Sequence, residues 1–227
     1  MGSIQMLEIP ERFNKNAADV RAMGSPADTG ARLIQYMCQR LGVQDLQDSD
    51  TLDFGCGSRF ADAIINKRLL VKSYTGIDVD RELIEFLCAH VQDSRMRFFH
   101  WDAYNPSYNP SGFPLKSDTR LPTADQTFDL ISMFSVITHQ LPSDAEALLS
   151  IFRRCIRPAG RIFFSATLQD MEEDYKELEP KWPTSHSAYS LRAITGIVER
   201  AGWRVLTMAG KAPQGHPIQD SFLCAPS

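Results

Sequence analysis

Long apolar runs are missing from this chain of 227 residues. Hydrophobic residues make up 43% of the sequence, which is enough for one sizeable core, but they occur in short runs. A membrane-spanning helix needs about 20 consecutive apolar residues, so none is expected. The N-terminal stretch MGSIQMLEIPERF also lacks a basic start followed by an apolar block, and we therefore expect no secretory signal.

Paired cysteines and clustered metal ligands are missing as well. The five cysteines are scattered and form no C-x-x-C pair, and the five histidines show no metal-binding spacing. This pattern is typical of a reducing compartment rather than of disulfides or zinc. We therefore expect a cytoplasmic protein without a metal site.

An excess of positive charge is the third absence, since the formal net charge is −4. A nucleic-acid-binding surface would need a basic stripe or patch. One cluster of arginines exists, and we interpret it as the solvated end of a helix, where cations complement the helix dipole. It comprises Arg153, Arg154, Arg157 and Arg161. No nucleic-acid or membrane partner is expected.

Short apolar runs alternate with helical patterns along the chain. Strands are predicted at 51–54, 74–79, 96–100, 128–134, 161–166, 203–208 and 221–224, and helices at 26–41, 81–91, 143–156 and 191–201. The helix at 143–156 carries a capping-box pattern at Ser143 and Glu146. This alternation predicts a parallel sheet covered by helices on both faces, although the direction of the last strands cannot be read from the pattern.

The chain shows no repeat or low-complexity linker. We therefore predict one globular domain at 46–227, preceded by an N-terminal helical extension at 1–45. An acidic segment at 169–181 is either a solvated loop or helix, or an insert that covers a substrate.

The first predicted strand leads into the loop Asp53-Phe54-Gly55-Cys56-Gly57-Ser58. Two glycines at alternate positions allow a sharp turn and a close approach of the backbone to a ligand. A dinucleotide fingerprint would have a third glycine where this chain has Phe60. The carboxylate of Asp53 would also repel a pyrophosphate, whereas it would attract a cationic ligand.

Two more acidic residues end the next two strands. Asp78 could accept hydrogen bonds from both hydroxyls of a ribose, while Asp80 suits the cap of the following helix. Asp102 could accept a hydrogen bond from the exocyclic amine of adenine, and the backbone amide of Ala103 could donate to a ring nitrogen. In a parallel sheet these acidic residues would meet beyond the carboxyl ends of the strands.

The succession DFGCG, GIDVD, WDA, FDLISMFSVITH and RPAGRIFF resembles class I S-adenosylmethionine-dependent methyltransferases over about residues 51–166. The resemblance implies a Rossmann-like, doubly wound, mostly parallel seven-stranded sheet, with the N-terminal extension covering the cofactor site. It implies S-adenosyl-L-methionine as cofactor, S-adenosyl-L-homocysteine as product and a small-molecule acceptor. The cofactor-binding residues it implies are Asp53, Gly55, Gly57, Asp78, Val79, Asp102, Ala103, Phe134 and Ser135.

The chain departs from the family pattern after the loop, where Arg59 follows Ser58 and the usual third glycine is missing. Arg59 either faces solvent in the first helical turn or pairs with the carboxylate of the donor. His139, after the fourth strand, is either a structural histidine or the base that takes a proton from an acceptor such as a hydroxyl group.

Three alternatives stay open on these residues. An NAD-dependent oxidoreductase would share the ribose carboxylate and the fold, but not Asp53 and Phe60. A nucleic-acid methyltransferase would share the donor site, but the fourth strand leads into Met133-Phe134-Ser135-Val136 rather than the Asn/Asp-Pro-Pro-aromatic tetrad of adenine-N6 enzymes. A non-catalytic adenosylmethionine-binding module would keep the fold with an altered loop.

Overall fold

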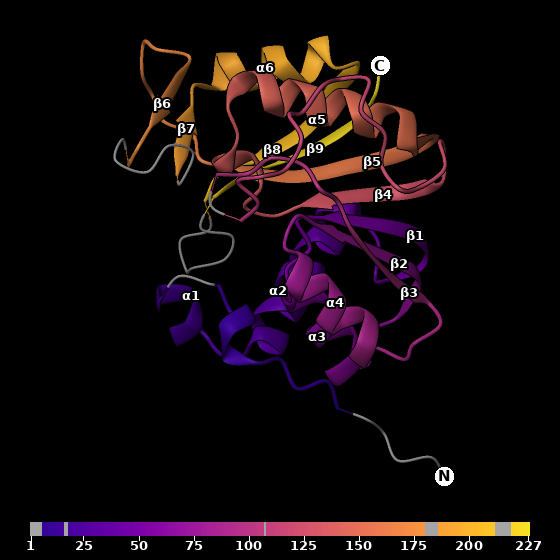
Figure 1. The fold of residues 1–227 in the computed structure, drawn as a ribbon. Helices are drawn as coiled ribbons and strands as arrows, with labels where there is room; N and C mark the ends of the chain where they lie inside the picture. The colour runs from indigo at the N-terminus through magenta and orange to yellow at the C-terminus, as the bar shows by residue number, and fades with distance from the viewer. Residues whose placement is uncertain (1–5, 16–17, 107, 180–185, 212–218) are drawn as a thin grey trace.

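A computed structural model describes residues 6–15, 18–106, 108–179, 186–211 and 219–227. It confirms the predicted fold class, a Rossmann-like sheet with helices on both faces (Figure 1). Seven strands follow the order β3-β2-β1-β4-β5-β9-β8, and only β9 runs against the others. The strands of this sheet are β1 (Leu46–Phe54), β2 (Val71–Asp78), β3 (Met96–His100), β4 (Phe128–Met133), β5 (Ile156–Ala166), β8 (Trp203–Ala209) and β9 (Asp220–Pro226).

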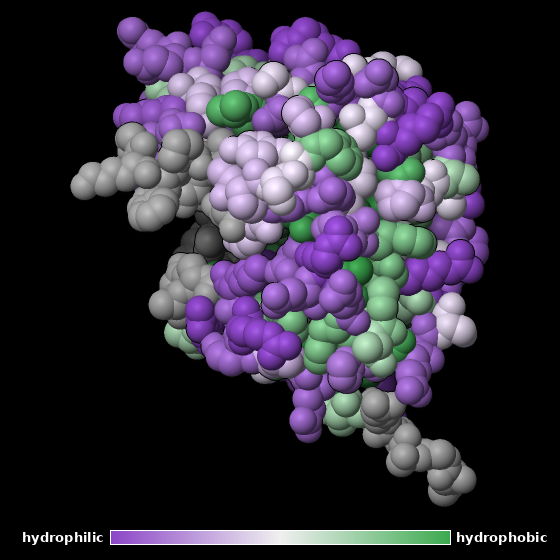
Figure 2. All heavy atoms as spheres, viewed as in Figure 1, coloured by the Kyte–Doolittle hydropathy of each residue, from purple (hydrophilic) through white to green (hydrophobic). Residues whose placement is uncertain are grey.

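The helices form two layers around the sheet (Figure 1). On one face lie α2 (Pro26–Leu41), α3 (Arg59–Asn66) and α4 (Arg81–His90), whose buried leucines and isoleucines share a core cluster with β1, β2 and β3. On the other face lie α5 (Pro142–Cys155) and α6 (Leu191–Arg200), which share a second cluster with β4, β5 and β8. Hydrophilic residues cover most of the outer surface of α5 and α6, as expected of helices that bury one side (Figure 2).

The N-terminal segment contains the short elements η1 (Glu11–Phe13) and α1 (Ala18–Ala22) before α2. Helix α2 begins and ends as its sequence predicts. Ser25 and Asp28 form a reciprocal capping box, Pro26 occupies the first turn, and Gly42 ends the helix in the left-handed region at φ 72°. The boundary between residues 1–45 and 46–227 stays a prediction.

Two local predictions are wrong. No capping box forms at Ser143, because α5 begins one residue earlier at Pro142, with Leu141 as an N-cap that makes no side-chain hydrogen bond. Glu146 instead pairs with Arg200 at 2.8 Å. The start of β5 at Ile156 was also missed, because the residues Pro158 and Gly160 within it resemble the end of a helix.

The arginine cluster is also more than a solvated helix end. Arg154 donates to the carbonyl oxygens of Ser117 and Thr119, both at 2.5 Å. Arg157 pairs with Asp50 on β1 at 2.9 Å and with Asp129 on β4 at 2.6 Å. These guanidinium groups connect neighbouring segments through hydrogen bonds and ion pairs, so they are engaged within the fold rather than forming a basic surface.

The acidic segment forms a small structure of its own. Strand β6 (Tyr175–Glu177) pairs antiparallel with β7 (Ser187–Tyr189) beside the main sheet. Residues 180 and 181 of the predicted segment lie outside the described residues. In the described part of the chain, no helix is long and apolar enough to cross a membrane.

The strand order reverses at β1, which lies between β2 and β4. The connections from β1 and from β4 therefore leave toward opposite faces of the sheet and open a crevice at its carboxyl edge. The order thus fixes where a ligand site belongs before any side chain is considered.

Candidate functional site

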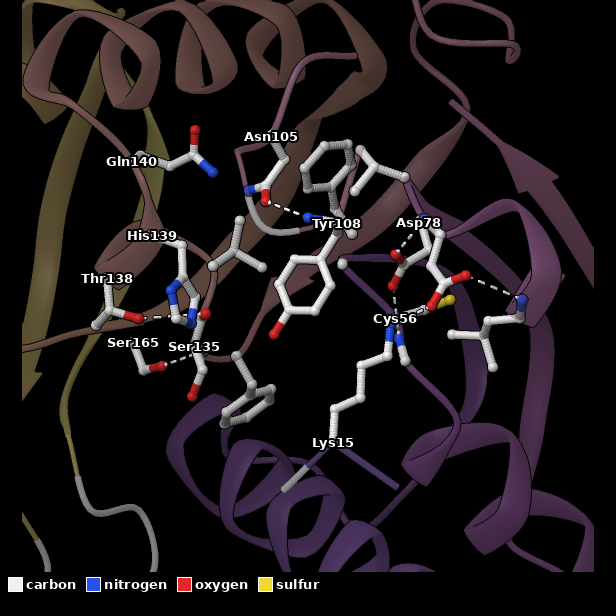
Figure 3. Close-up of a pocket in the computed structure, with 18 of the residues that line it drawn as sticks. Lys15, Cys56, Asp78, Asn105, Tyr108, Ser135, Thr138, His139, Gln140 and Ser165 are labelled. Carbon is white, nitrogen blue, oxygen red and sulfur yellow. Dashed lines mark hydrogen bonds and ion pairs between the residues drawn. The ribbon is translucent and has the colours of Figure 1, made fainter. Parts of the chain in front are cut away.

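A cavity of about 560 Å³ lies at this carboxyl edge (Figure 3). Its walls come from the loop after β1, the end of β2, the loop after β3, the turn after β4 and the N-terminal segment. In the close-up, Asp78 and Cys56 lie on one side, Ser135, Thr138 and His139 lie on the other, and Tyr108 stands between them.

The glycine loop turns sharply at the end of β1. Gly55 and Gly57 have φ angles of 67° and 51°, in the left-handed region that glycine adopts without steric cost. A Cβ atom on Gly55 would lie only 2.5 Å from Cγ2 of Val136. The backbone N–H groups of Gly55 and Cys56 both donate to the carbonyl oxygen of Ile77, at 2.8 and 3.1 Å. The two predicted glycines therefore line the cavity with backbone alone.

Asp78 lies at the end of β2 and lines the cavity. Its two carboxylate oxygens accept the backbone N–H groups of Gly57 at 2.9 Å and Asp80 at 3.0 Å. Burial raises the pKa of this carboxyl group, and the two N–H donors oppose that shift. Asp80 accepts from the N–H of Leu83 at 3.2 Å and so caps α4, as predicted. Next to Asp78, Val79 also lines the cavity.

Asp53 does not line the cavity. Only 3% of it is exposed, and its carboxylate accepts the hydroxyl groups of Tyr74 and Ser132, each at 2.8 Å. Burial raises its pKa to about 7, while these two hydrogen bonds and the charge of Arg59 act in the opposite direction. The predicted direct contact between Asp53 and the donor is therefore not supported by this geometry.

The predicted adenine contacts also differ from the structure. Asp102 is exposed, lies outside the cavity lining and accepts the side-chain amide of Asn109 at 3.0 Å. Ala103 does line the cavity, but its N–H already donates to the carbonyl oxygen of Trp101 at 2.8 Å. The loop after β3 folds back on itself through these bonds, which the sequence pattern does not reveal.

Phe134 and Ser135 line the cavity where β4 ends. The ring of Phe134 lies 5.5 Å from that of Phe60, so the position where a dinucleotide loop has glycine here holds a buried aromatic ring. Ser135 has a φ angle of 58°, a strained conformation for a residue with a Cβ atom. Its N–H donates to Oγ of Ser165 at 2.9 Å, and its hydroxyl donates to Oε1 of Gln219 at 3.3 Å.

His139 lines the opposite wall from Asp78, on the short helix η2 (Ile137–His139). Its ring meets the ring of Tyr108 edge-on, with the centroids 6.5 Å apart. The neighbouring Thr138 donates its hydroxyl to the carbonyl oxygen of Ser135 at 3.2 Å, which ties η2 to the strained turn. The structure thus brings His139 to the same cavity as the glycine loop.

Several lining residues were not predicted individually. Lys15 pairs with Asp80 and lies 4.6 Å from the centroid of the Tyr108 ring, so it spans the cavity from the N-terminal segment. Glu179 and His186, on either side of residues 180–185, which lie outside the described residues, also line the cavity. The acidic run and the N-terminal helical pattern were the only sequence signals for these residues. The described residues contain no group of three or more potential metal ligands.

A family model for the methyltransferase domain matches residues 27–208. The chain belongs to this family. The predicted class and cofactor are thereby confirmed: the chain is an S-adenosylmethionine-dependent methyltransferase domain, with S-adenosylhomocysteine as the product of its donor. The same family match excludes the alternative of an NAD-dependent oxidoreductase.

Solved structures share the fold. An S-adenosylmethionine-dependent methyltransferase from Mesorhizobium loti is 12% identical, with a TM-score of 0.62 over 87% of this chain and 99% of that one. A 1,6-didemethyltoxoflavin-N1-methyltransferase from Burkholderia thailandensis, solved with S-adenosylhomocysteine, is 14% identical, with a TM-score of 0.59 over 92% of this chain and 81% of that one. At these identities the likeness concerns the fold alone.

Relatives detected by sequence are named ribosomal protein L11 methyltransferases. One from Ralstonia nicotianae is 27% identical over 64% of this chain and 42% of its own length, and one from Xanthomonas campestris is 26% identical over 77% and 53%. The chain thus spans about half the length of these relatives. Because they are named for a protein substrate, the expected partner, a small-molecule acceptor, is contradicted.

Proposed function

We propose that this domain transfers the methyl group of S-adenosylmethionine to a nucleophilic group of a protein. The observation that carries the proposal is that one cavity joins a glycine loop and a ribose-type carboxylate to a polar wall around His139. The names of the sequence relatives support a protein as the acceptor.

The donor side of the cavity fits the adenosyl and methionine groups. Gly55 and Gly57 line the cavity without side chains, so a ligand can approach their backbone closely. Each oxygen of Asp78 accepts one backbone N–H and keeps a lone pair for a ribose hydroxyl. Val79, Ala103, Phe134 and Ser135 line the cavity, and we assign the first two to the adenine and the last two to the methionine part. We retain these seven predicted residues as the donor site.

Bound S-adenosylmethionine supplies a methyl group already activated by the sulfonium. The protein therefore contributes mainly alignment and exclusion of water. Ser135, which we assign to the wall beside the methyl group, is held in its strained conformation by hydrogen bonds with Ser165, Gln219 and Thr138. Tyr108 faces this wall across the cavity (Figure 3).

His139 is our candidate for the base that takes the proton of the acceptor. Histidine changes its charge near neutral pH, which suits proton transfer from an amine or a hydroxyl group. The ring stands on the wall shared with Ser135 and Thr138 and meets the ring of Tyr108 edge-on. A non-catalytic binding module would not need a titratable group at this place.

The test uses the purified chain with S-adenosylmethionine labelled in its methyl group. Ribosomal protein L11 and, separately, total soluble protein serve as acceptors. We expect label to appear in protein and to be lost in the variant Asp78→Ala. Label found only in the small-molecule fraction, or none with either protein source, would overturn a protein acceptor.

Calorimetry tests the donor separately. S-adenosylhomocysteine should bind in the micromolar range, about −8 kcal/mol, and NAD at least about tenfold more weakly, because Phe60 occupies the place of the third dinucleotide glycine. Tighter binding of NAD would contradict the assigned donor site.

A further inference from the structure

Arg59 is the first residue of α3 and lines the cavity beside the glycine loop. It makes no hydrogen bond or ion pair to any residue that the structure describes. Burial lowers the pKa of its guanidinium group, and the charge of Asp53 acts against that shift. Asp53 acts on Arg59 through its charge but makes no hydrogen bond or ion pair with it, and the Asp53 carboxylate accepts the hydroxyl groups of Tyr74 and Ser132.

Ser58 lies beside Arg59, and its side chain likewise lines the cavity without a hydrogen bond to any described residue. Only 3% of Ser58 is exposed, and it lines the cavity. As the N-cap of α3 it makes no side-chain capping bond, and within the described residues its hydroxyl has no hydrogen-bond partner. Its hydroxyl oxygen remains accessible from the cavity and is therefore available to a ligand.

The backbone of Arg59 is fixed from behind by α2. A Cβ atom on Gly30 would lie 2.3 Å from the carbonyl oxygen of Arg59, so the two helices approach each other as closely as a glycine allows. This contact sets where α3 begins and therefore where its first N–H groups point. The N-terminus of a helix carries partial positive charge and unpaired N–H donors.

A guanidinium group, a hydroxyl group and a helix N-terminus therefore converge on one corner of the cavity, and an anion satisfies all three. Arg59 is only partly exposed and makes no hydrogen bond or ion pair within the described residues, so a ligand that brings the opposite charge can gain a charge-assisted hydrogen bond there. The proposed donor contains one carboxylate, on its methionine part. We propose that Arg59, with Ser58 and the first turn of α3, binds the carboxylate of S-adenosylmethionine. This inference rests on the proposed function.

The experiment compares two ligands that differ only in this carboxylate. S-adenosylhomocysteine and its decarboxylated analogue, S-adenosyl-3-thiopropylamine, are titrated calorimetrically into the parent protein and into Arg59→Gln. The parent should bind S-adenosylhomocysteine about 10- to 100-fold more tightly than the analogue, the range of a charge-assisted hydrogen bond. In Arg59→Gln this preference should nearly vanish, while the affinity for the analogue stays unchanged.

Arg81→Gln is the matched control, because Arg81 is the first residue of α4 but is exposed and outside the cavity lining. It should keep the full preference. Arg59→Lys should retain part of the preference for S-adenosylhomocysteine. The same comparison of ligands is made with this variant if Arg59→Gln does not fold.

Three results would overturn the inference. The parent could bind both ligands equally, Arg59→Gln could weaken both by the same factor, or the preference could persist in both Arg59 variants. The failure of the proposed donor site itself has a different signature, because then neither ligand would bind the parent.

Discussion

The backbone N–H of Gly57 donates to Oδ2 of Asp78 at 2.9 Å. This hydrogen bond joins the turn after β1 to the end of β2, although 21 residues separate the two partners. The carboxylate that we assign to the ribose therefore also holds the glycine loop in its cavity-facing conformation. A change at Asp78 must act on both.

Asp78→Ala should lower the affinity for S-adenosylhomocysteine by more than about tenfold, because charge-assisted hydrogen bonds of about 1.5–3 kcal/mol each are lost. The melting temperature should fall moderately as well, since the N–H groups of Gly57 and Asp80 lose their acceptor, while the cap of α4 at Asp80 remains. Calorimetry and a thermal melt measure the two quantities. Asp102→Ala is the matched control, because this exposed carboxylate lies outside the cavity and should leave the affinity unchanged. A sharp loss of stability in Asp78→Ala with intact affinity would make Asp78 a structural residue only.

Gly55→Ala should destabilise the protein more than Gly57→Ala. Both substitutions place a side chain on left-handed backbone, at about 1–2 kcal/mol, but only the first meets Val136, at 2.5 Å. No atom lies within 4 Å of a Cβ atom built on Gly57. We expect a loss of about 2–4 kcal/mol for Gly55→Ala, as strain and overpacking add. Urea unfolding of the two variants side by side checks the order, and equal losses would contradict it.

The raised pKa of Asp53 predicts a dependence of stability on pH. Between the ordinary value of 3.8 and about 7, the folded protein keeps a proton that the unfolded chain has released. The contribution of Asp53 to the free energy of unfolding therefore falls as pH rises toward 7 and is constant above it.

Asp53→Asn removes this titration. From pH 5 to pH 8 the stability of the parent should fall relative to the variant by about 2–3 kcal/mol. Urea unfolding at several pH values within this range gives the difference directly. Two parallel curves would show that the Asp53 carboxyl group has the same pKa in the folded and unfolded states.

His139→Ala should lower turnover by about 10²–10⁴-fold and leave the affinity for S-adenosylhomocysteine unchanged. Transfer of labelled methyl groups to protein and calorimetry separate the two effects. His90→Ala is the control, because His90 stacks on Phe86 outside the cavity. If His139 is structural, stability, donor affinity and turnover should fall together. Near-normal turnover would remove it from the mechanism.

Much of the fold could be predicted because its signals are local. The strand at 96–100 and the cap of α4 at Asp80 were found from a few adjacent residues. The antiparallel direction of β9 could not be found, because strand direction depends on how the chain returns to the sheet. Pro142 likewise displaced the predicted capping box by fixing the first turn of α5.

The site residues divide in the same way: those set by the strand pattern could be predicted, and those set by distant contacts could not. Gly55, Gly57 and Asp78 reach the cavity because the ends of successive parallel strands share one edge. The position of Asp53 depends on the hydroxyl of Tyr74, 21 residues away, and that of Asp102 on Asn109 in a loop that folds back. Lys15 enters from the N-terminal segment, whose docking no periodic pattern encodes.

Gln219 reaches Ser135 and Ser165 from the residue just before β9. In the sheet β9 lies between β5 and β8, although it follows β8 along the chain, so β8 cannot join the sheet before β9 has paired with β5. During folding, the wall of the cavity at Ser135 is therefore complete only after the C-terminal end of the chain has returned to β5, a pairing that joins residues 54 to 62 positions apart. Competence to bind the donor should therefore require the pairing of β9 with β5 and not only the pairing of β1 to β5.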